Sequence, residues 1–118
     1  IIPRGTILET TDDMWYAALD INLTAAFTKN LGRDHAGDGI RVNAVCPHEV
    51  NTPMLRSGFV QRGLGPDTAI EALGKTVPLG HVADPAEIAD VIAFLASDES
   101  RYVCGETIEV TGAKPVSG

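Results

Sequence analysis

Polar residues that could bind a small molecule gather in residues 47–54, directly after an apolar stretch. Residues 40–46 carry only two polar side chains, Arg41 and Asn43, and this pattern predicts a strand that is buried on both faces. Pro47 ends the strand because it has no N–H group for a sheet ladder. Ligands of open α/β sheets bind just beyond the carboxyl ends of the strands. The loop that begins at Pro47 is therefore the first candidate for a small-molecule site.

Side chains with nucleophilic or metal-binding chemistry are scattered along the chain. His35, His48 and His81 show no spacing typical of metal ligands, so no metal site is predicted. Cys46 and Cys104 lie in apolar surroundings, and we expect buried free thiols in a reducing cytoplasm instead of a disulfide framework. The sequence has no G-x-G-x-x-G motif, which is the fingerprint of a dinucleotide-binding loop.

Composition limits the class of protein. The 118 residues are 44% hydrophobic and 21% charged, which suits one globular domain with a core. The formal net charge of −7 disfavours a nucleic-acid partner, because such binding depends on Lys and Arg neutralising phosphates. No apolar run approaches the ~20 residues of a membrane helix, and no signal peptide is seen. We therefore expect a cytoplasmic protein that binds neither nucleic acid nor membranes.

One long helix is predicted before the loop. It starts near Thr10 or Thr11 and runs to about His35. Asn22 is a polar residue beside its apolar stripe, and two interpretations remain open. Asn22 is either exposed or bonded to the local backbone, or it is buried and holds a water molecule or a side chain. The stripe itself, at four-residue steps, consists of Trp15, Leu19, Leu23, Phe27 and Leu31.

Two short helices are predicted after the loop. The first covers residues 54–62, with Thr52 as its cap and Pro53 in its first turn. The second is capped by Asp67 and runs to about Gly74. Gly and Pro residues interrupt this stretch, which is typical of a mobile lid. A plain surface connector is the alternative interpretation.

The last part of the chain predicts a helix followed by a strand. Asp84 is a typical N-cap, Pro85 suits the first helical position, and Glu87 completes a capping box. The helix should end near residues 97–98, and residues 106–110 form the second strand. The order helix, strand, lid, helix, strand implies a right-handed crossover and a parallel sheet, which is an α/β fold.

These motifs resemble the C-terminal half of a classical short-chain dehydrogenase/reductase. Residues 39–45 followed by Pro47 resemble the sixth strand of that family, and residues 52–54 resemble the end of its nicotinamide loop. The resemblance covers nearly the whole chain and implies a Rossmann-like doubly wound parallel sheet, of which only the C-terminal part is represented. Further segments resemble, in order, the helix before the catalytic Ser, the last helix and the last strand: residues 15–23, 78–80, 84–89, 94–97 and 105–108.

The resemblance implies reversible hydride transfer between NAD or NADP and a small-molecule alcohol or carbonyl. Asn22 resembles the catalytic Asn of the family, which anchors a proton-relay water. Val50 would meet the nicotinamide carboxamide through its backbone amide and Thr52 through its hydroxyl. His48 departs from the family pattern, which has Gly there, and its side chain would narrow the pocket or contact substrate. The full set of implied cofactor-binding positions is Pro47, His48, Val50, Thr52, Pro53 and Met54.

The resemblance also implies a substrate lid and an oligomer. Arg56 and Arg62 are candidates for holding an acidic substrate, although a solvated surface position is the alternative for both. Residues 11–35 and 106–110 correspond to the assembly surfaces of the family, which implies a homodimer or homotetramer. The apolar lid residues, which follow Met54, are Leu55, Phe59, Val60 and Leu64.

One departure from the family concerns the catalytic centre. The family places a catalytic Ser and a Tyr-x-x-x-Lys pair between the helix with Asn22 and the helix before the sixth strand, whereas here these segments join near residues 23–27. Neither Tyr16 nor Tyr102 has a Lys four residues later. Because the chain also opens without Met, we expect one partial domain, residues 1–118, from a parent of about twice 12.4 kDa. The alternative is a truncated, non-catalytic chain that serves as a binding or structural subunit.

Overall fold

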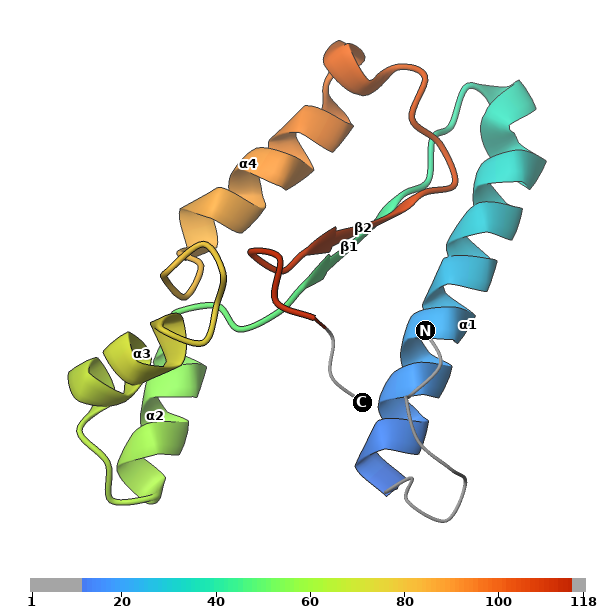
Figure 1. The fold of residues 1–118 in the computed structure, drawn as a ribbon. Helices are drawn as coiled ribbons and strands as arrows, with labels where there is room; N and C mark the ends of the chain where they lie inside the picture. Colours follow the sequence, from blue (N-terminus) through green and yellow to red (C-terminus); the bar gives the residue numbers. More distant parts are fainter. Residues whose placement is uncertain (1–11, 116–118) are drawn as a thin grey trace.

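The computed structural model describes the backbone of residues 12–115 and the side chains of residues 22–115. The predicted order of helices and strands is confirmed, while the predicted helix start at Thr10 or Thr11 lies outside the described residues. Two short 3-10 turns, η1 (Ala36–Asp38) and η2 (Asp98–Ser100), follow the first and last long helices. The elements shown in Figure 1 are α1 (Asp12–His35), β1 (Ala44–Pro47), α2 (Pro53–Gln61), α3 (Pro66–Gly74), α4 (Pro85–Ala96) and β2 (Thr107–Val110).

The two strands form a parallel pair. Ala44 lies opposite Thr107, and Pro47 lies opposite Val110. Figure 1 shows α1 on one side of the pair and α4 on the other. Parallel strands need a long crossover connection, and α2, α3 and α4 all lie within it. The α/β class and the parallel pairing predicted from the element order are therefore confirmed.

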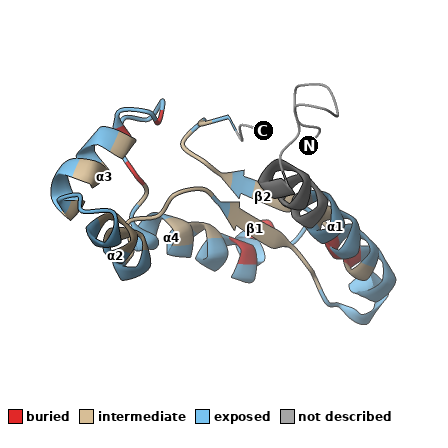
Figure 2. Cartoon of the chain, turned by 90° about the horizontal axis from the view of Figure 1, so that it is seen from below, coloured by how far each residue is buried: buried red, intermediate tan, exposed pale blue. Residues whose placement is uncertain are grey.

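The first strand is shorter than predicted. Residues 40–46 have the pattern of a seven-residue strand, but β1 begins only at Ala44. Gly105 in the partner segment adopts a φ of +80°, which interrupts the regular ladder at this point, although its N–H still donates to the carbonyl oxygen of Val42 at 2.7 Å. The strand residues are at most half-buried instead of buried on both faces, as Figure 2 shows, because one helix on each side covers them only in part.

α1 approaches the strands through small and polar residues instead of its apolar stripe. Thr28 is 5% exposed, whereas Leu23 and Phe27 are 69% and 63% exposed. A Cβ atom added to Gly32 would lie 2.8 Å from both Cα and N of Gly105. The helix backbone therefore lies directly against the turn before β2, and Leu23 and Phe27 of the apolar stripe are left exposed.

Arg41 joins the segment before β1 to the end of α4. Its Nη1 atom donates to Ser100 Oγ at 3.0 Å and to the Val103 carbonyl oxygen at 3.2 Å. Its Nη2 atom donates to the carbonyl oxygens of Leu95 at 2.8 Å and Ser97 at 3.1 Å. Carbonyl groups at the end of a helix have no hydrogen-bond partner within the helix, and those of Leu95 and Ser97 are satisfied by Arg41 together with the Ser100 hydroxyl.

Asn43 secures the same loop from the other side. Its Nδ2 atom donates to the Val103 carbonyl oxygen at 3.0 Å, and its Oδ1 atom accepts from the Glu106 N–H at 3.1 Å. Cys104 Sγ lies 3.5 Å from the carbonyl oxygen of Gly32. Both cysteines are free thiols, as predicted, but they are half-buried instead of fully buried.

The helix caps match the sequence prediction in two cases of three. Thr52 caps α2, and the Glu87 carboxylate accepts from the Asp84 N–H at 2.8 Å, as the predicted capping box of α4 requires. The predicted cap of α3 is wrong: Asp67 lies inside the first turn of that helix. Gly65 occupies the N-cap position, and the Asp67 carboxylate instead pairs with Arg56 at 2.8 Å.

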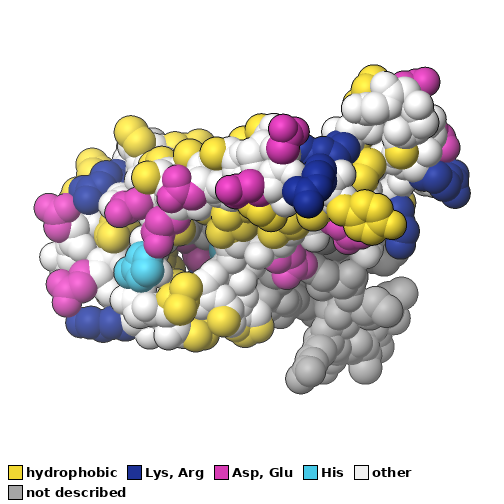
Figure 3. All heavy atoms as spheres, turned by 90° about the horizontal axis from the view of Figure 1, so that it is seen from above, with side chains coloured by type: hydrophobic (Ala, Val, Ile, Leu, Met, Phe, Trp, Pro, Cys, Tyr) yellow, Lys and Arg dark blue, Asp and Glu magenta, His cyan; other side chains and the backbone are white. Residues whose placement is uncertain are grey.

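Large apolar side chains lie exposed on several elements. Figure 3 shows hydrophobic side chains among acidic and basic ones on one face of the molecule. Soluble monomers rarely expose extensive apolar surface, so Leu23 and Phe27 on α1 agree with the predicted assembly surface, which stays a prediction. Within the described residues, no helix combines the length and the apolar character needed to cross a bilayer.

Arg41→Lys should lower the free energy of unfolding by about 2–4 kcal/mol, because an ammonium group cannot reach the four acceptors that the planar guanidinium fork reaches. Urea unfolding followed by circular dichroism measures this loss. Arg33→Lys is the matched control, since Arg33 contacts only Asp34 and Asn30 at the surface, and its effect should stay within about 0.5 kcal/mol. Equal midpoints for both variants would contradict the role given to Arg41.

Gly32→Ala should destabilise the protein, although Ala normally favours a helix by about 0.5–1 kcal/mol over Gly. The new methyl group would meet the Gly105 backbone at 2.8 Å. Gly58→Ala in α2 is the control, because nothing lies within 4 Å of its added Cβ. The unfolding midpoints should therefore move in opposite directions, and a shift of the same sign for both would show that the α1 contact is not tight.

Candidate functional site

The loop after β1 is held in place at its centre. Val50 forms a parallel bridge with Ala83, and the Asn51 N–H donates to the Ala83 carbonyl oxygen at 2.8 Å. Thr52 Oγ1 accepts from the Leu55 N–H at 3.4 Å and so caps α2. The loop is thus anchored by the segment before α4 and leads directly into a helix.

Two hydrogen-bond donors of this loop remain available. The Val50 N–H makes no hydrogen bond within the part of the chain that the structure describes. The Thr52 hydroxyl oxygen accepts one bond, from the Leu55 N–H, and its own proton stays free to donate. A backbone amide and a hydroxyl close together in sequence can bind a carbonyl or carboxamide oxygen.

A pocket of ≈ 500 Å³ lies between this loop and α2. It brings together seven of the residues predicted for the cofactor and the lid, while Pro53, Val60 and Leu64 are not among its lining residues. Asn22 lies on α1, is exposed, and does not line the pocket. The lining residues are Pro47, His48, Glu49, Val50, Thr52, Met54, Leu55, Gly58, Phe59 and Arg62.

Arg56 ties the predicted lid to the loop. Its Nε atom donates to Asn51 Oδ1 at 2.9 Å, and its Nη1 atom donates to Asp67 Oδ1 at 2.8 Å. The first contact fixes the start of α2 on the loop, and the second joins α2 to α3. Arg56, one of the two arginines predicted to face a substrate or solvent, therefore has a structural role.

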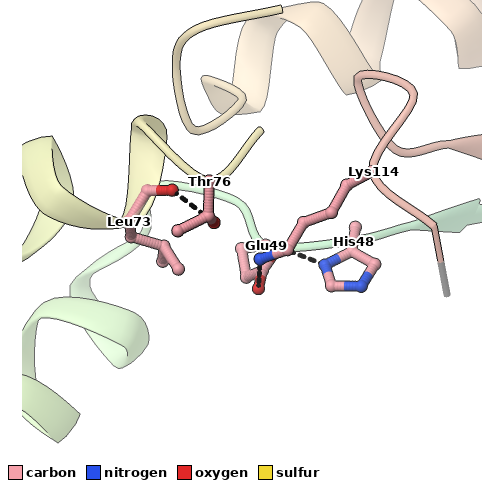
Figure 4. Close-up of polar contacts among 5 residues, drawn as sticks. All are labelled: His48, Glu49, Leu73, Thr76 and Lys114. Atoms are coloured by element: carbon pink, nitrogen blue, oxygen red, sulfur yellow. Dashed lines mark hydrogen bonds and ion pairs between the residues drawn. The ribbon is translucent and has the colours of Figure 1, made fainter. Parts of the chain in front are cut away.

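A charged cluster joins the loop to the segment after β2. Lys114 Nζ donates to Glu49 Oε1 at 2.6 Å, and His48 Nδ1 contacts the same carboxylate, as Figure 4 shows. The Lys114 and Glu49 side chains are only 17% and 24% exposed. Ala113 precedes the lysine with a φ of +65°, a left-handed conformation that is uncommon for residues other than Gly. His48, which the sequence analysis placed near cofactor or substrate, also belongs to this cluster.

The cluster changes the ionisation of Glu49. Burial alone would raise the pKa of its carboxyl group, but the hydrogen bonds from Lys114, from its own backbone and from His48 outweigh burial and hold the pKa below its usual range. Sequence analysis missed Glu49 and Lys114. The two residues lie 65 positions apart, and no local pattern connects them.

A second cavity of ≈ 60 Å³ lies behind the loop and includes His48 and His81 in its lining. His81 Nε2 lies 3.0 Å from Glu87 Oε1 on the surface. The hydrogen bond to Glu87 raises the pKa of His81, and the bond from the Asp84 amide, followed by that of His81, lowers the pKa of Glu87. No group of three or more His, Cys, Asp or Glu residues in the described part of the chain is arranged to hold a metal ion.

The family model and the similar sequences all point to one group of oxidoreductases. A family model described as enoyl-(acyl carrier protein) reductase matches residues 24–112. Oxidoreductase UcpA of Salmonella typhimurium is 41% identical over 98 residues, which are 80% of this chain and 36% of that protein. Human (3R)-3-hydroxyacyl-CoA dehydrogenase is 39% identical over 92 residues, 78% of this chain and 31% of the relative. The chain thus spans about a third of the length of these relatives.

Solved structures agree with the sequence comparison. A short chain dehydrogenase family protein from Francisella tularensis superposes with a TM-score of 0.73 and 32% identity, covering 90% of this chain and 46% of that one. Ligand-free aldohexose dehydrogenase from Thermoplasma acidophilum superposes with a TM-score of 0.75 and 27% identity, covering 93% of this chain and 46% of that one.

Glu49→Gln should lower the free energy of unfolding by about 1–2 kcal/mol at pH 7, because it removes a half-buried charged partner of Lys114. The folded-state pKa of Glu49 is depressed, so the contribution of Glu49 is present above the unfolded-state pKa of about 4.5. It is lost as the pH falls through the lower folded-state value, where the wild type and the variant should converge.

Urea unfolding between pH 3 and pH 8 tests this expectation. Glu71→Gln is the matched control, because Glu71 pairs with Lys75 at 3.0 Å while both side chains are more than 70% exposed, at 72% and 74%. That surface pair should contribute less than about 0.5 kcal/mol. A pH-independent difference between wild type and Glu49→Gln would refute the ionic role of Glu49.

Proposed function

The chain belongs to the short-chain dehydrogenase/reductase family, and we propose that the whole protein is an NAD(P)-dependent oxidoreductase. It transfers a hydride between the nicotinamide cofactor and a small alcohol or carbonyl compound. The loop after β1 carries this proposal, because the free Val50 amide and the Thr52 hydroxyl face a pocket beyond the carboxyl end of a parallel strand. The names of two relatives, a hydroxyacyl-CoA dehydrogenase and an aldohexose dehydrogenase, support an alcohol or carbonyl substrate.

The loop residues suit a nicotinamide. A carboxamide both donates and accepts hydrogen bonds, and Val50 N–H and Thr52 Oγ1–H are two donors for its oxygen. When bound, the cofactor supplies the hydride chemistry, and the loop selects which ring face meets the substrate. His48 and Met54 line the same pocket. NAD and NADP are both compatible with this part of the site.

The proton-handling part of the site involves Asn22, by its resemblance to the catalytic Asn of the family. In the structure, α1 continues without a break through residues 23–27, where two family segments join in this sequence. The family match begins at residue 24, which supports the interpretation that α1 combines pieces of two helices. The catalytic Ser, Tyr and Lys of the proposed enzyme then belong to a longer parent protein.

The proposal also covers the oligomeric state and the cellular location of the protein. Exposed Leu23 and Phe27 on α1 support a homodimer or homotetramer built on this helix. Two free thiols support a reducing, cytoplasmic location. Neither nucleic acid nor a membrane is a proposed partner, given the net charge of −7.

The protein purified from its source should oxidise secondary alcohols with NAD⁺ or NADP⁺, measured as NAD(P)H absorbance. Its intact mass should be about twice 12.4 kDa. Thr52→Val should raise the KM for the cofactor about three- to tenfold through loss of the hydroxyl donor, and it should also lower the unfolding midpoint because the cap of α2 is lost. Thr52→Ser, which keeps both roles, should restore the KM and the midpoint.

Ser57→Ala is the control for this experiment, because Ser57 lies exposed on the same helix and bonds only the Met54 carbonyl oxygen. An intact mass of 12.4 kDa without NAD(P) binding would refute the oxidoreductase and leave the non-catalytic subunit as the function.

A further inference from the structure

We infer that the pocket beside α2 takes a ligand with an apolar body and an anionic group, and that Arg62 recognises the anion. This inference rests on the proposed function for two points, namely that the ligand is the substrate of the enzyme and that Val50 and Thr52 mark the nicotinamide end of the site. The apolar part of the pocket comes from α2, where Leu55 and Phe59 are half-buried and Met54 is 83% exposed at the entrance. Such a wall suits a hydrocarbon chain.

Arg62 lies at the end of this apolar wall. It is the C-cap residue of α2, and it follows Phe59 by three positions and Leu55 by seven, so all three residues share one face of the helix. Its guanidinium group makes no hydrogen bond or ion pair within the described residues. A guanidinium without a partner on the rim of an apolar pocket is a typical binding group for carboxylate or phosphate.

The other charges close to the pocket are already neutralised. Glu49 is held by Lys114 and His48, and Arg56 is held by Asn51 and Asp67. Among the residues that line the pocket in the described part of the chain, Arg62 is therefore the exposed cation that has no protein partner. Within the described residues, the side chain of Arg56 has protein partners and that of Arg62 has none, although the sequence alone gives no sign of this difference.

The length of α2 sets the separation between the anion and the reacting end of the substrate. Thr52 and Arg62 are ten positions apart, which corresponds to about 15 Å along a helix axis. The donors Val50 and Thr52 mark the nicotinamide end. The anion therefore lies at the far end of an extended apolar chain, and short hydroxy acids, whose carboxylate adjoins the reacting carbon, are excluded as matching substrates.

Binding of three probes to the purified full-length protein tests the inference without turnover. The probes are dodecanoate, dodecyl phosphate and uncharged dodecanol, each below its aggregation concentration, with affinities measured by isothermal titration calorimetry. Arg62→Gln should weaken binding of the preferred anionic probe about five- to tenfold and change dodecanol binding less than twofold. Arg62→Lys should recover part of the loss. The anion that depends more on Arg62 identifies the ligand as a carboxylate or a phosphate ester.

Arg101→Gln is the matched control, because Arg101 is exposed, bonds only the Asp98 carbonyl oxygen and does not line the pocket. It should leave the affinities for all three probes unchanged. Equal losses of anion and dodecanol binding in Arg62→Gln, or no loss at all, would overturn the inference. The outcome is independent of the oxidoreductase test: Arg62-dependent binding without NAD(P) activity supports the anion site and refutes only the proposed enzyme.

Discussion

The guanidinium of Arg41 is the contact on which the arrangement of the strands depends. It binds two carbonyl oxygens at the end of α4 and two groups in the loop before β2. The end of the crossover is thereby fixed next to the start of β1. Because Gly32 allows α1 to touch Gly105 on the opposite side, the turn before β2 is held between two elements. The parallel pair is short, and these flanking contacts add to its own ladder.

The loop after β1, which lines the pocket, is held in place at two points. The bridge between Val50 and Ala83 holds the middle of the loop, and the ion pair between Glu49 and Lys114 holds its start. The helix α2, which forms one wall of the pocket, has fewer contacts with the rest of the chain, because α2 and α3 pack chiefly on each other. The loop that carries the two hydrogen-bond donors is therefore held at two points, whereas α2 and α3 have fewer contacts with the rest of the chain.

Signals that act over a few residues made much of this structure predictable. The capping box at Asp84, the cap at Thr52 and the order of the elements all follow from local signals, and so does the loop that follows the end of β1. The failures share a different cause. The length of β1 depends on the turn at Gly105, and the role of Asp67 depends on Arg56. Neither partner is adjacent in sequence, so no periodicity or cap rule reveals the contact.

The same distinction applies to the charges around the pocket. Sequence alone treats Arg56 and Arg62 alike, and only the three-dimensional partners show that one is neutralised and the other is not. In a chain with a net charge of −7, a single exposed guanidinium cannot attract anions over long distances, because salt screens its field within about 10 Å. Its influence is confined to contact with a ligand already in the pocket. Arg62 therefore governs how long an anionic ligand stays bound, while the apolar face of α2 governs whether the ligand enters.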